Sequence, residues 1–446
     1  MVNNGPVADE LTIRLEAGIR GDMLDFPWDT RLAHWPEELL IALPRGISRH
    51  VVRFVDVDGT VMAVKEITER FAQREFGLLR SLAELEIPAV HGVGVVTGRR
   101  DSNGEELPGA LITEHLTWSI PYRSVYSRKV RPETVDRLLD ALVLLLARLH
   151  LVGFVWNDCS LSNVLFRRDA GAFAAYLVDA ETGELHEVLS DGQRRQDVEI
   201  AHLNIAGGLM DLQAGGRLSP DLDPIAIADE VPTRYERLWA ELTSSERVAG
   251  TQRWRIARRV ERLNELGFDV AELDLRPRTD GTVRIQPKVV DAGHHSRRLL
   301  RLVGLDVGEN QARRLLNDLD QFCALQNRDA TSGARGGSPG LARSSPREDV
   351  LAAHRWLSEV YEPVVSAIPD EHRTKLEDAE IFHEVLEHRW YLSENAGRDV
   401  GLQEAVDDYI ANILEKKPDE VTLLPMSGDD TGMLELDALG LDKPEA

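Results

Sequence analysis

The stretch VWNDCSLSNVLF, residues 155 to 166, places a carboxylate and a carboxamide, Asp158 and Asn163, five positions apart among apolar residues. Burial of such polar groups is costly unless they are hydrogen-bonded. A polar pair at the edge of an apolar strand therefore predicts either a turn whose side chains bond to their own backbone, or a site that binds a charged group. The rest of the sequence bears on this choice.

The composition is that of a globular protein. Of 446 residues, 43% are hydrophobic and 29% are charged, which is enough chain for two or three domains. The formal net charge of −24 disfavours general binding to nucleic acid or anionic membranes. The two cysteines, Cys159 and Cys323, have neither zinc-site nor disulfide spacing, and no signal peptide is visible, so we expect a cytoplasmic protein.

The most apolar stretch predicts a core helix and no membrane span. Residues 138–156, LLDALVLLLARLHLVGFVW, include Asp140, Arg148 and His150, and their leucines recur at helical spacing.

The first half of the chain alternates strand and helix patterns. VVRFVDV and TVMAVKEI flank Asp58-Gly59, a tight-hairpin signal, and a helical stretch leads to a second strand pair, GVGVVTG and GALITEHL. After Pro132 the pattern is mostly helical, apart from a hairpin made of NVLFRR and AAYLVDA. We predict an α+β fold with a small sheet-rich lobe over 38–118 and a larger helical lobe over 119–242.

The remaining parts follow from composition shifts. Residues 1–37 read as an N-terminal extension and 243–327 as an accessory α+β unit containing the hairpin ELDLRPRTDGTVRIQPKVV. We expect a flexible linker over 328–347, a helical segment over 348–415 and a disordered acidic tail over 416–446.

Two opposite charges fall on inward faces. Strand alternation in VMAVKEI sets Lys65 among apolar neighbours. On the following helix, Glu75 shares a stripe with Phe71, Leu78, Leu79 and Leu82. Because an unpaired buried charge is unfavourable, this pattern predicts a Lys65–Glu75 ion pair.

A second carboxylate is expected near the opening motif. Asp179 ends the strand AAYLVDA, and its hairpin partner NVLFRR begins with Asn163, so the two side chains should meet at one end of the hairpin. Asp158 lies just upstream. Oxygen ligands of this kind suit six-coordinate Mg²⁺, which bridges to substrate phosphates.

Lys65, Glu75, the D-x-x-x-x-N of Asp158 to Asn163, and Asp179 at a strand end resemble, in this order, the protein-kinase fold. The compact form is similar to lipopolysaccharide and small-molecule kinases. The longer match, from WPEELLIALPRGISRHVVRFV to FHEVLEHRWYLSENAGRDVG, resembles an actinobacterial family of unknown function, DUF4032, which bears a lipopolysaccharide-kinase-like domain.

The resemblance implies roles for these residues. Lys65 would hold nucleotide phosphates and Glu75 would orient it. Asp158 would accept the proton of the attacking hydroxyl, and Asn163 and Asp179 would bind Mg²⁺.

The resemblance also implies contacts to ATP. Glu114 to Leu116 would offer backbone groups to adenine, and Asp197 would brace the catalytic loop. The phosphate-covering loop, PRGISRHVVRF, has Gly46 alone where the kinase pattern has several glycines. Ser48, Arg49 or His50 could replace backbone contacts by side-chain contacts.

Other motifs have competing interpretations. Cys159 invites a nucleophile reading, but without a matching histidine it is better explained by packing. In FHEVLEHRW the two histidines are five residues apart, unlike the i, i+4 spacing that converges on zinc, so a solvated or interface helix is favoured. The segment 247–314 carries a net charge of about +6, which fits a solvated face paired with acidic groups or a surface for a phosphorylated or nucleic-acid partner.

The sequence therefore predicts an ATP- and Mg²⁺-dependent phosphotransferase acting on a hydroxyl of an unidentified small-molecule, glycan or protein acceptor. The alternative is a catalytically inactive kinase-like module that binds nucleotide or serves as a scaffold. The departures from the kinase pattern, Trp156-Asn157 before Asp158 and Ala180-Glu181 after Asp179, keep that alternative open. The acceptor and the oligomeric state are not predicted.

Overall fold

The computed structural model describes residues 11–16, 21–41, 50–126, 130–244, 246–249, 258, 261–263, 268–277, 282–332 and 346–417. The chain folds into two compact units. Among the described residues, unit 1 comprises those up to Arg167 together with Ala175–Tyr235, and unit 2 comprises Arg168–Ala174 with those from Glu236 onward. The tip of one hairpin thus belongs to unit 2. The finer domain division drawn from the sequence stays a prediction.

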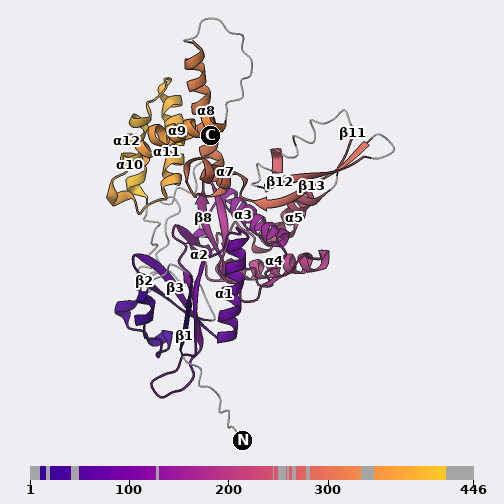
Figure 1. Cartoon of the computed structure of the whole chain (residues 1–446), viewed down its shortest axis with the longest axis vertical. Helices are drawn as coiled ribbons and strands as arrows, with labels where there is room; N and C mark the ends of the chain where they lie inside the picture. The colour runs from indigo at the N-terminus through magenta and orange to yellow at the C-terminus, as the bar shows by residue number, and fades with distance from the viewer. Residues whose placement is uncertain are drawn as a thin grey trace. The chain divides into compact units, whose positions relative to one another are not determined.

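Unit 1 begins with a five-stranded antiparallel sheet in the order β1-β4-β5-β3-β2 (Figure 1). Asp58 and Gly59 connect β2 and β3 with φ angles of 53° and 81°, as a type I′ turn requires, so the predicted hairpin is confirmed. The strands are β1 (Thr12–Leu15), β2 (Val51–Val57), β3 (Thr60–Ile67), β4 (Gly92–Thr97) and β5 (Gly109–Glu114).

Helix α1 (Glu69–Glu84) contacts β4 and β5 of this sheet. Its buried stripe consists of Ala72, Glu75, Phe76, Leu79 and Leu82. Glu75 is therefore inward as predicted. The predicted stripe is wrong at Phe71, which is 40% exposed, because the buried face runs through Ala72 and Phe76.

The chain before β2 completes the core of the sheet. Short helical turns η1 (Gly21–Asp25), η2 (Leu32–His34) and η3 (Glu37–Leu39) bring Trp28 and Trp35 against its apolar residues. The fully buried Arg99 guanidinium fixes this segment by donating to the carbonyl oxygens of Trp28 and Thr30, at 2.9 and 2.6 Å. It also pairs with Glu66 at 3.1 Å.

The rest of unit 1 is mainly helical. Helix α3 (Pro132–Leu151) buries most of its leucines and His150, which confirms the predicted core helix. Helix α4 (Asp191–Ala214) begins with a capping box of Ser190 and Gln193, and α5 (Pro224–Thr243) runs on into unit 2. The remaining elements are β6 (Ser119–Pro121), α2 (Tyr122–Val125), β7 (Phe154–Val155), η4 (Leu161–Asn163), β8 (Val164–Asp169), β9 (Ala172–Leu177) and β10 (Glu184–Leu185).

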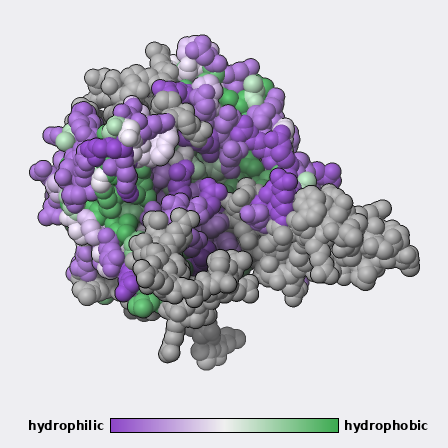
Figure 2. All heavy atoms as spheres, turned by 90° about the horizontal axis from the view of Figure 1, so that it is seen from above, coloured by the Kyte–Doolittle hydropathy of each residue, from purple (hydrophilic) through white to green (hydrophobic). Residues whose placement is uncertain are grey.

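On the face that Figure 2 shows, hydrophilic side chains cover much of the described surface, with hydrophobic areas among them. No helix in the described ranges combines the length and the hydropathy needed to cross a membrane.

Unit 2 contains the hairpin predicted for the accessory unit and a group of helices. Strands β12 (Phe268–Pro277) and β13 (Thr282–Ala292) are antiparallel, and β11 (Glu246–Ala249) joins the other edge of β13. Two helices, α7 (His294–Val303) and α8 (Glu309–Ser332), follow. The later elements are α9 (Pro346–Trp356), η5 (Leu357–Tyr361), α10 (Glu362–Ser366), η6 (Asp370–His372), α11 (Asp378–Ala396), α12 (Leu402–Asn412) and η7 (Leu414–Lys416).

Several expectations meet the limits of the described chain. The structure assigns 328–332 to the end of α8 and starts α9 at Pro346, where proline suits a first helical turn. Residues 333–345, most of the expected linker, lie outside the described residues, as does the acidic tail from 418 onward. Of the basic segment, Arg262 is described and pairs with Glu241 at 2.9 Å.

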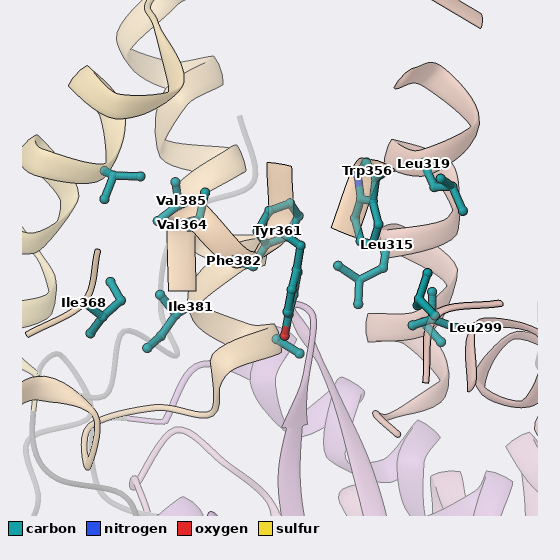
Figure 3. Packing of buried hydrophobic residues seen from close by; sticks show 14 of the residues in the cluster. Leu299, Leu315, Leu319, Trp356, Tyr361, Val364, Ile368, Ile381, Phe382 and Val385 are labelled. Carbon is teal, nitrogen blue, oxygen red and sulfur yellow. The ribbon is translucent and has the colours of Figure 1, made fainter. Parts of the chain in front are cut away.

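An aromatic cluster forms the centre of unit 2 (Figure 3). The Phe382 ring lies 5.9 Å from that of Trp356, nearly perpendicular to it, and 5.1 Å from that of Tyr361. Leucines from α7 and α8 pack beside them, as Figure 3 shows for Leu299 and Leu315.

The FHEVLEHRW motif lies on α11 and contributes to this core. Glu384 accepts hydrogen bonds from Tyr409 Oη at 2.7 Å and Lys417 Nζ at 2.8 Å, while His388 is 2.6 Å from Asp408. The first half of α11 is buried, so the solvated alternative of the predicted solvated or interface helix is wrong there. Hydrophobic residues interleaved with the charged ones bury it, and the buried Glu384 carboxylate is paired.

We predict that Arg99→Ala destabilises unit 1 by about 3–5 kcal/mol, because it leaves the buried Glu66 without its charged partner. The matched control is Arg100→Ala, next in sequence, whose partner Glu106 is 81% exposed and whose loss should cost less than about 1 kcal/mol. Urea unfolding of both variants measures the difference. Equal losses would show that the Arg99 network does not hold the N-terminal segment.

Candidate active site

Lys65 lies at the centre of a charged cluster in unit 1. Alternation along β3 directs Met62 and Val64 into the core and leaves Lys65 on the opposite face, with its side chain 12% exposed. Its Nζ lies 3.0 Å from Glu75 Oε2 and 2.8 Å from Asp179 Oδ2. The structure therefore brings together three of the predicted site residues from β3, α1 and the turn after β9.

Glu181, named above only as a departure from the kinase pattern, is a fourth member of this cluster. Its Oε2 lies 3.5 Å from Lys65 Nζ and 3.1 Å from His50 Nε2. Its position, two residues after the predicted metal ligand Asp179, is the signal that could have identified it. The chain thus places an acidic side chain close to the position of the glycine that ordinarily follows this aspartate in kinases.

The cluster contains three carboxylates and one ammonium, and this imbalance shifts the ionisation of its members. Burial and the Asp179 charge raise the pKa of Glu75 to about 7, although Lys65 acts in the opposite direction. Burial works against a charged Lys65, but Glu75 and Asp179 outweigh it, so the pKa of Lys65 is raised. Burial would also raise the pKa of Asp179, yet Lys65 outweighs it, and that pKa is lowered.

Asp179 is fixed from several sides. The Ala180 amide donates to Glu75 Oε1 at 3.3 Å, and the Glu181 amide donates to Asp179 Oδ1 at 3.0 Å. The Trp156 indole donates to the Asp179 carbonyl at 2.7 Å, and Thr182 Oγ1 donates to the Trp156 carbonyl at 2.9 Å. These bonds join the turn after β9 to the loop that carries Asp158.

Asp158 and Asn163 form the interaction that the opening motif suggested. Asn163 Nδ2 donates to the Asp158 carbonyl at 2.9 Å and to its Oδ2 at 3.1 Å. The Asn163 carbonyl accepts from the Val178 amide at 3.0 Å, so Asn163 lies beside the end of β9. Because only the amide nitrogen of Asn163 is used for Asp158, its side-chain oxygen is the atom suited to a metal ion.

A residue missed in the sequence also orients Asp158. Asn204 on α4 donates to Asp158 Oδ1 at 3.3 Å and to the Cys159 carbonyl at 3.2 Å. It lies seven residues after Asp197, on the same face of α4, and this spacing was the available signal.

Asp197 holds the loop in place. Its fully buried carboxylate accepts from the Trp156 amide at 2.9 Å and the Asn157 amide at 2.7 Å, and lies 2.9 Å from His150 Nε2. Asn157 has a φ of 62°, a conformation that non-glycine residues seldom adopt. The Asp197 bonds support this strained residue immediately before Asp158.

The other predicted site residues divide into two groups. Gly46, Ser48 and Arg49 lie outside the described residues, so the phosphate-loop assignments stay predictions. Glu114 ends β5 opposite Met62, and its amide donates to the His91 carbonyl at 2.9 Å. The next residue, His115, donates its amide to the Val61 carbonyl, and Leu116 follows. Contacts of this segment with adenine stay a prediction.

Cys159 is fully buried beside these groups. Burial, together with the charges of Asp197 and Asp158, raises the pKa of its thiol well above the usual range. Such a thiol is a poor nucleophile, in keeping with the packing interpretation.

The donor set suits a divalent cation. Within the described ranges, ligand oxygens of Glu75, Asp179 and Glu181 all lie within 4.8 Å of one another. Carboxylate oxygens together with the Asn163 amide oxygen are hard ligands of the kind that Mg²⁺ prefers. The three carboxylates around Lys65 carry more negative charge than one ammonium balances, which also favours a cation in addition to Lys65.

Comparisons with known proteins match two parts of the chain to two family models. Residues 62–205 match the model described as "Lipopolysaccharide kinase (Kdo/WaaP) family", and residues 237–414 match "Domain of unknown function (DUF4032)". Both resemblances predicted from the sequence are confirmed. With the first match and the mixed sheet and helices, the α+β, kinase-like fold class is confirmed too.

Similarity to other proteins is weaker. A solved structure titled "WaaP in complex with acyl carrier protein" aligns with 51% of this chain and 99% of its own, at 18% identity and a TM-score of 0.31. That score is too low to support a conclusion about this chain. No curated protein gives a significant match.

The raised pKa of Glu75 predicts a pH dependence of stability. Because its folded-state pKa of about 7 lies above the unfolded value, stability is lost as pH rises from about 4.5 through 7. We expect the parent to lose roughly 3 kcal/mol relative to Glu75→Gln between pH 5 and pH 8. Chemical denaturation at each pH measures this loss. Glu84→Gln, an exposed position on α1, is the control and should follow the parent; a Glu75→Gln curve parallel to the parent would contradict the assignment.

Proposed function

We propose that unit 1 is an ATP- and Mg²⁺-dependent phosphotransferase that transfers the γ-phosphate to a hydroxyl group. The observation that carries this proposal is the contact of Lys65 with both Glu75 and Asp179. A buried lysine between a helix carboxylate and a strand-end carboxylate is the arrangement that kinases use to hold nucleotide phosphates beside a metal ion. The match of residues 62–205 to a kinase family supports it.

The residues divide the chemistry among them. Lys65, positioned by Glu75, would bind the phosphates, while Asp179 and the side-chain oxygen of Asn163 would hold Mg²⁺. The ion, when bound, neutralises charge on the transferred phosphoryl group. Glu181 would add a further carboxylate to the cation site.

Asp158 would receive the proton in this reaction. Asn163 and Asn204 hold its carboxylate by hydrogen bonds, so it would accept the proton of the attacking hydroxyl in a fixed orientation. The hydroxyl oxygen forms a bond to the γ-phosphorus, the bond from that phosphorus to the bridging oxygen breaks, and ADP leaves. Most of the barrier reduction would come from positioning and charge neutralisation.

The proposed acceptor is a small molecule, glycan or protein that carries a hydroxyl group. Only the type of reaction indicates this class. A cytoplasmic location is part of the proposal and fits the low number of cysteines, two in 446 residues. Gly46, Ser48 and Arg49, with His50, would cover the phosphates, and the backbone of Glu114 to Leu116 would contact adenine.

Nucleotide and metal binding can be tested directly. We expect ATP with Mg²⁺ to raise the melting temperature of the parent, and Asp179→Asn to abolish the Mg²⁺-dependent part of the rise. Asp211→Asn, an exposed aspartate on α4, should behave as the parent. A rise in Asp179→Asn that keeps its full Mg²⁺ dependence would exclude Asp179 as a ligand.

Catalysis requires a separate variant. Asp158→Asn should bind Mg²⁺-ATP as the parent does but lose at least about a hundredfold in ATP turnover, the size expected for removing a general base. Phosphate release with a coupled assay measures this. Equal turnover would remove Asp158 from its role, and the absence of turnover in both proteins would favour the inactive nucleotide-binding module.

A further inference from the structure

One hairpin links the candidate metal ligands to unit 2. Strands β8 and β9 are neighbours in one sheet, with Asn163 just before β8 and Asp179 two residues after β9. The opposite end of this hairpin, Arg168–Ala174, belongs to unit 2. The same two strands therefore carry the ligand pair at one end and are held by unit 2 at the other.

Asp169 at the hairpin tip caps helix α8. Its Oδ1 accepts from the Gln311 amide at 2.7 Å, and its Oδ2 accepts from the Asn310 amide and Nδ2, both at 3.1 Å. These are the second and third residues of α8, whose amides have no partner within the helix. A capping residue usually precedes its own helix. Here a residue about 140 positions earlier takes that role, and only the folded chain reveals it.

The cap is closely fitted. Asp169 is 2% exposed, and a Cβ on Gly308 would lie 2.5 Å from Asp169 Oδ1, so the residue before α8 must be glycine for the carboxylate to enter. Ala170, also buried, donates its amide to Glu380 Oε2 at 2.9 Å. Gln311 Nε2 donates to the same oxygen at 3.2 Å. The tip is thus bound by α8 and α11 together.

Burial of the Asp169 carboxylate at the hairpin tip is energetically unfavourable in itself. A carboxylate buried in this way loses its hydration, and three donors are needed to compensate it. Both α8 and α11 lie within residues 237–414, the segment that matches a family of unknown function. Two helices of that segment therefore bind the tip of the hairpin. The candidate metal ligands lie at the other end of the same hairpin.

We propose that the helices of unit 2 position the Mg²⁺ ligands of unit 1 through this hairpin, and that Asp169 is the positioning residue. The inference rests on the proposed function, because it concerns the metal ion of that site. When Asp169 caps α8, the tip is fixed, and the paired strands hold Asn163 and Asp179 in register. When the cap is lost, the hairpin is free to shift and the two ligands lose their spacing.

The test compares Mg²⁺-ATP binding with metal-free ATP binding. In Asp169→Ala and Gly308→Ala full-length protein, the Kd for Mg²⁺-ATP should rise about tenfold or more, as expected when a metal ligand loses its support. The Kd for ATP in EDTA should rise by a clearly smaller factor, because Lys65 keeps its partner Glu75 on α1. Asp169→Asn keeps one acceptor oxygen and should give a smaller loss, which allows a test if the other variants do not fold. Isothermal titration calorimetry measures all of these constants.

Leu316→Ala is the matched control. This residue is 1% exposed in the core of unit 2 and on α8, so its truncation destabilises the same helix without touching the cap. It should leave both dissociation constants unchanged at temperatures where the protein is folded. An unchanged Mg²⁺-ATP affinity in Asp169→Ala, or an equal loss in Leu316→Ala, would overturn the proposal.

Hydrogen exchange separates this proposal from the proposed function. The Val178 amide, which donates to the Asn163 carbonyl, should exchange faster in Asp169→Ala than in the parent and in Leu316→Ala. If the parent binds no ATP, the proposed function fails, and the exchange at Val178 still decides whether the cap fixes the hairpin. Unchanged exchange there would refute the positioning role.

Discussion

A buried lysine stays charged only where carboxylates compensate for its lost hydration, and this constraint organises unit 1. The ammonium of Lys65 binds Glu75 from α1 and Asp179 from the turn after β9, which are 10 and 114 positions away in the sequence. Neither carboxylate has another full positive charge within ion-pair distance among the described residues. The three groups therefore depend on one another, and the sheet, the helix and the hairpin must meet at this point.

The negative charge around Lys65 exceeds what one ammonium can balance. Glu181 brings a third carboxylate, and the raised pKa of Glu75 is the direct consequence of burial and crowding. A divalent cation would relieve this repulsion, and nucleotide phosphates would provide Lys65 with a new partner. Under the proposed function, the electrostatics of the cluster would therefore favour a metal–nucleotide complex over an anion alone.

Buried carboxylates act as organisers elsewhere in the chain as well. The Asp197 carboxylate accepts hydrogen bonds from two amides of the Asp158 loop and lies within hydrogen-bond distance of His150. The Asp169 carboxylate accepts hydrogen bonds from two amides in the first turn of α8. In each case a backbone segment that has no regular partner is fixed by a side chain from a distant element. Asp197 thus fixes the Asp158 loop within unit 1, and Asp169 fixes the hairpin tip to α8 within unit 2.

The sequence by itself determined the local elements and the order of the charged residues. The Asp58-Gly59 turn, the α1 helix, the β8–β9 hairpin and the leucine-rich α3 follow from short-range propensity and periodicity, which depend only on neighbouring residues. Lys65, Glu75 and Asp179 could be chosen because each falls on an inward or terminal position of such an element. The predicted stripe of α1 was misplaced at Phe71, since one helical face is hard to distinguish from the next when apolar residues lie on both.

Only the tertiary structure decided which distant groups meet. Glu181 beside Lys65, Asn204 on Asp158 and Asp169 on α8 are pairs separated by 46 to 141 positions, and no local pattern records such distances. Hydrogen bonds and ion pairs act over about 3 Å, so their partners are set by how the elements pack, whereas turns and helices are set by adjacent residues.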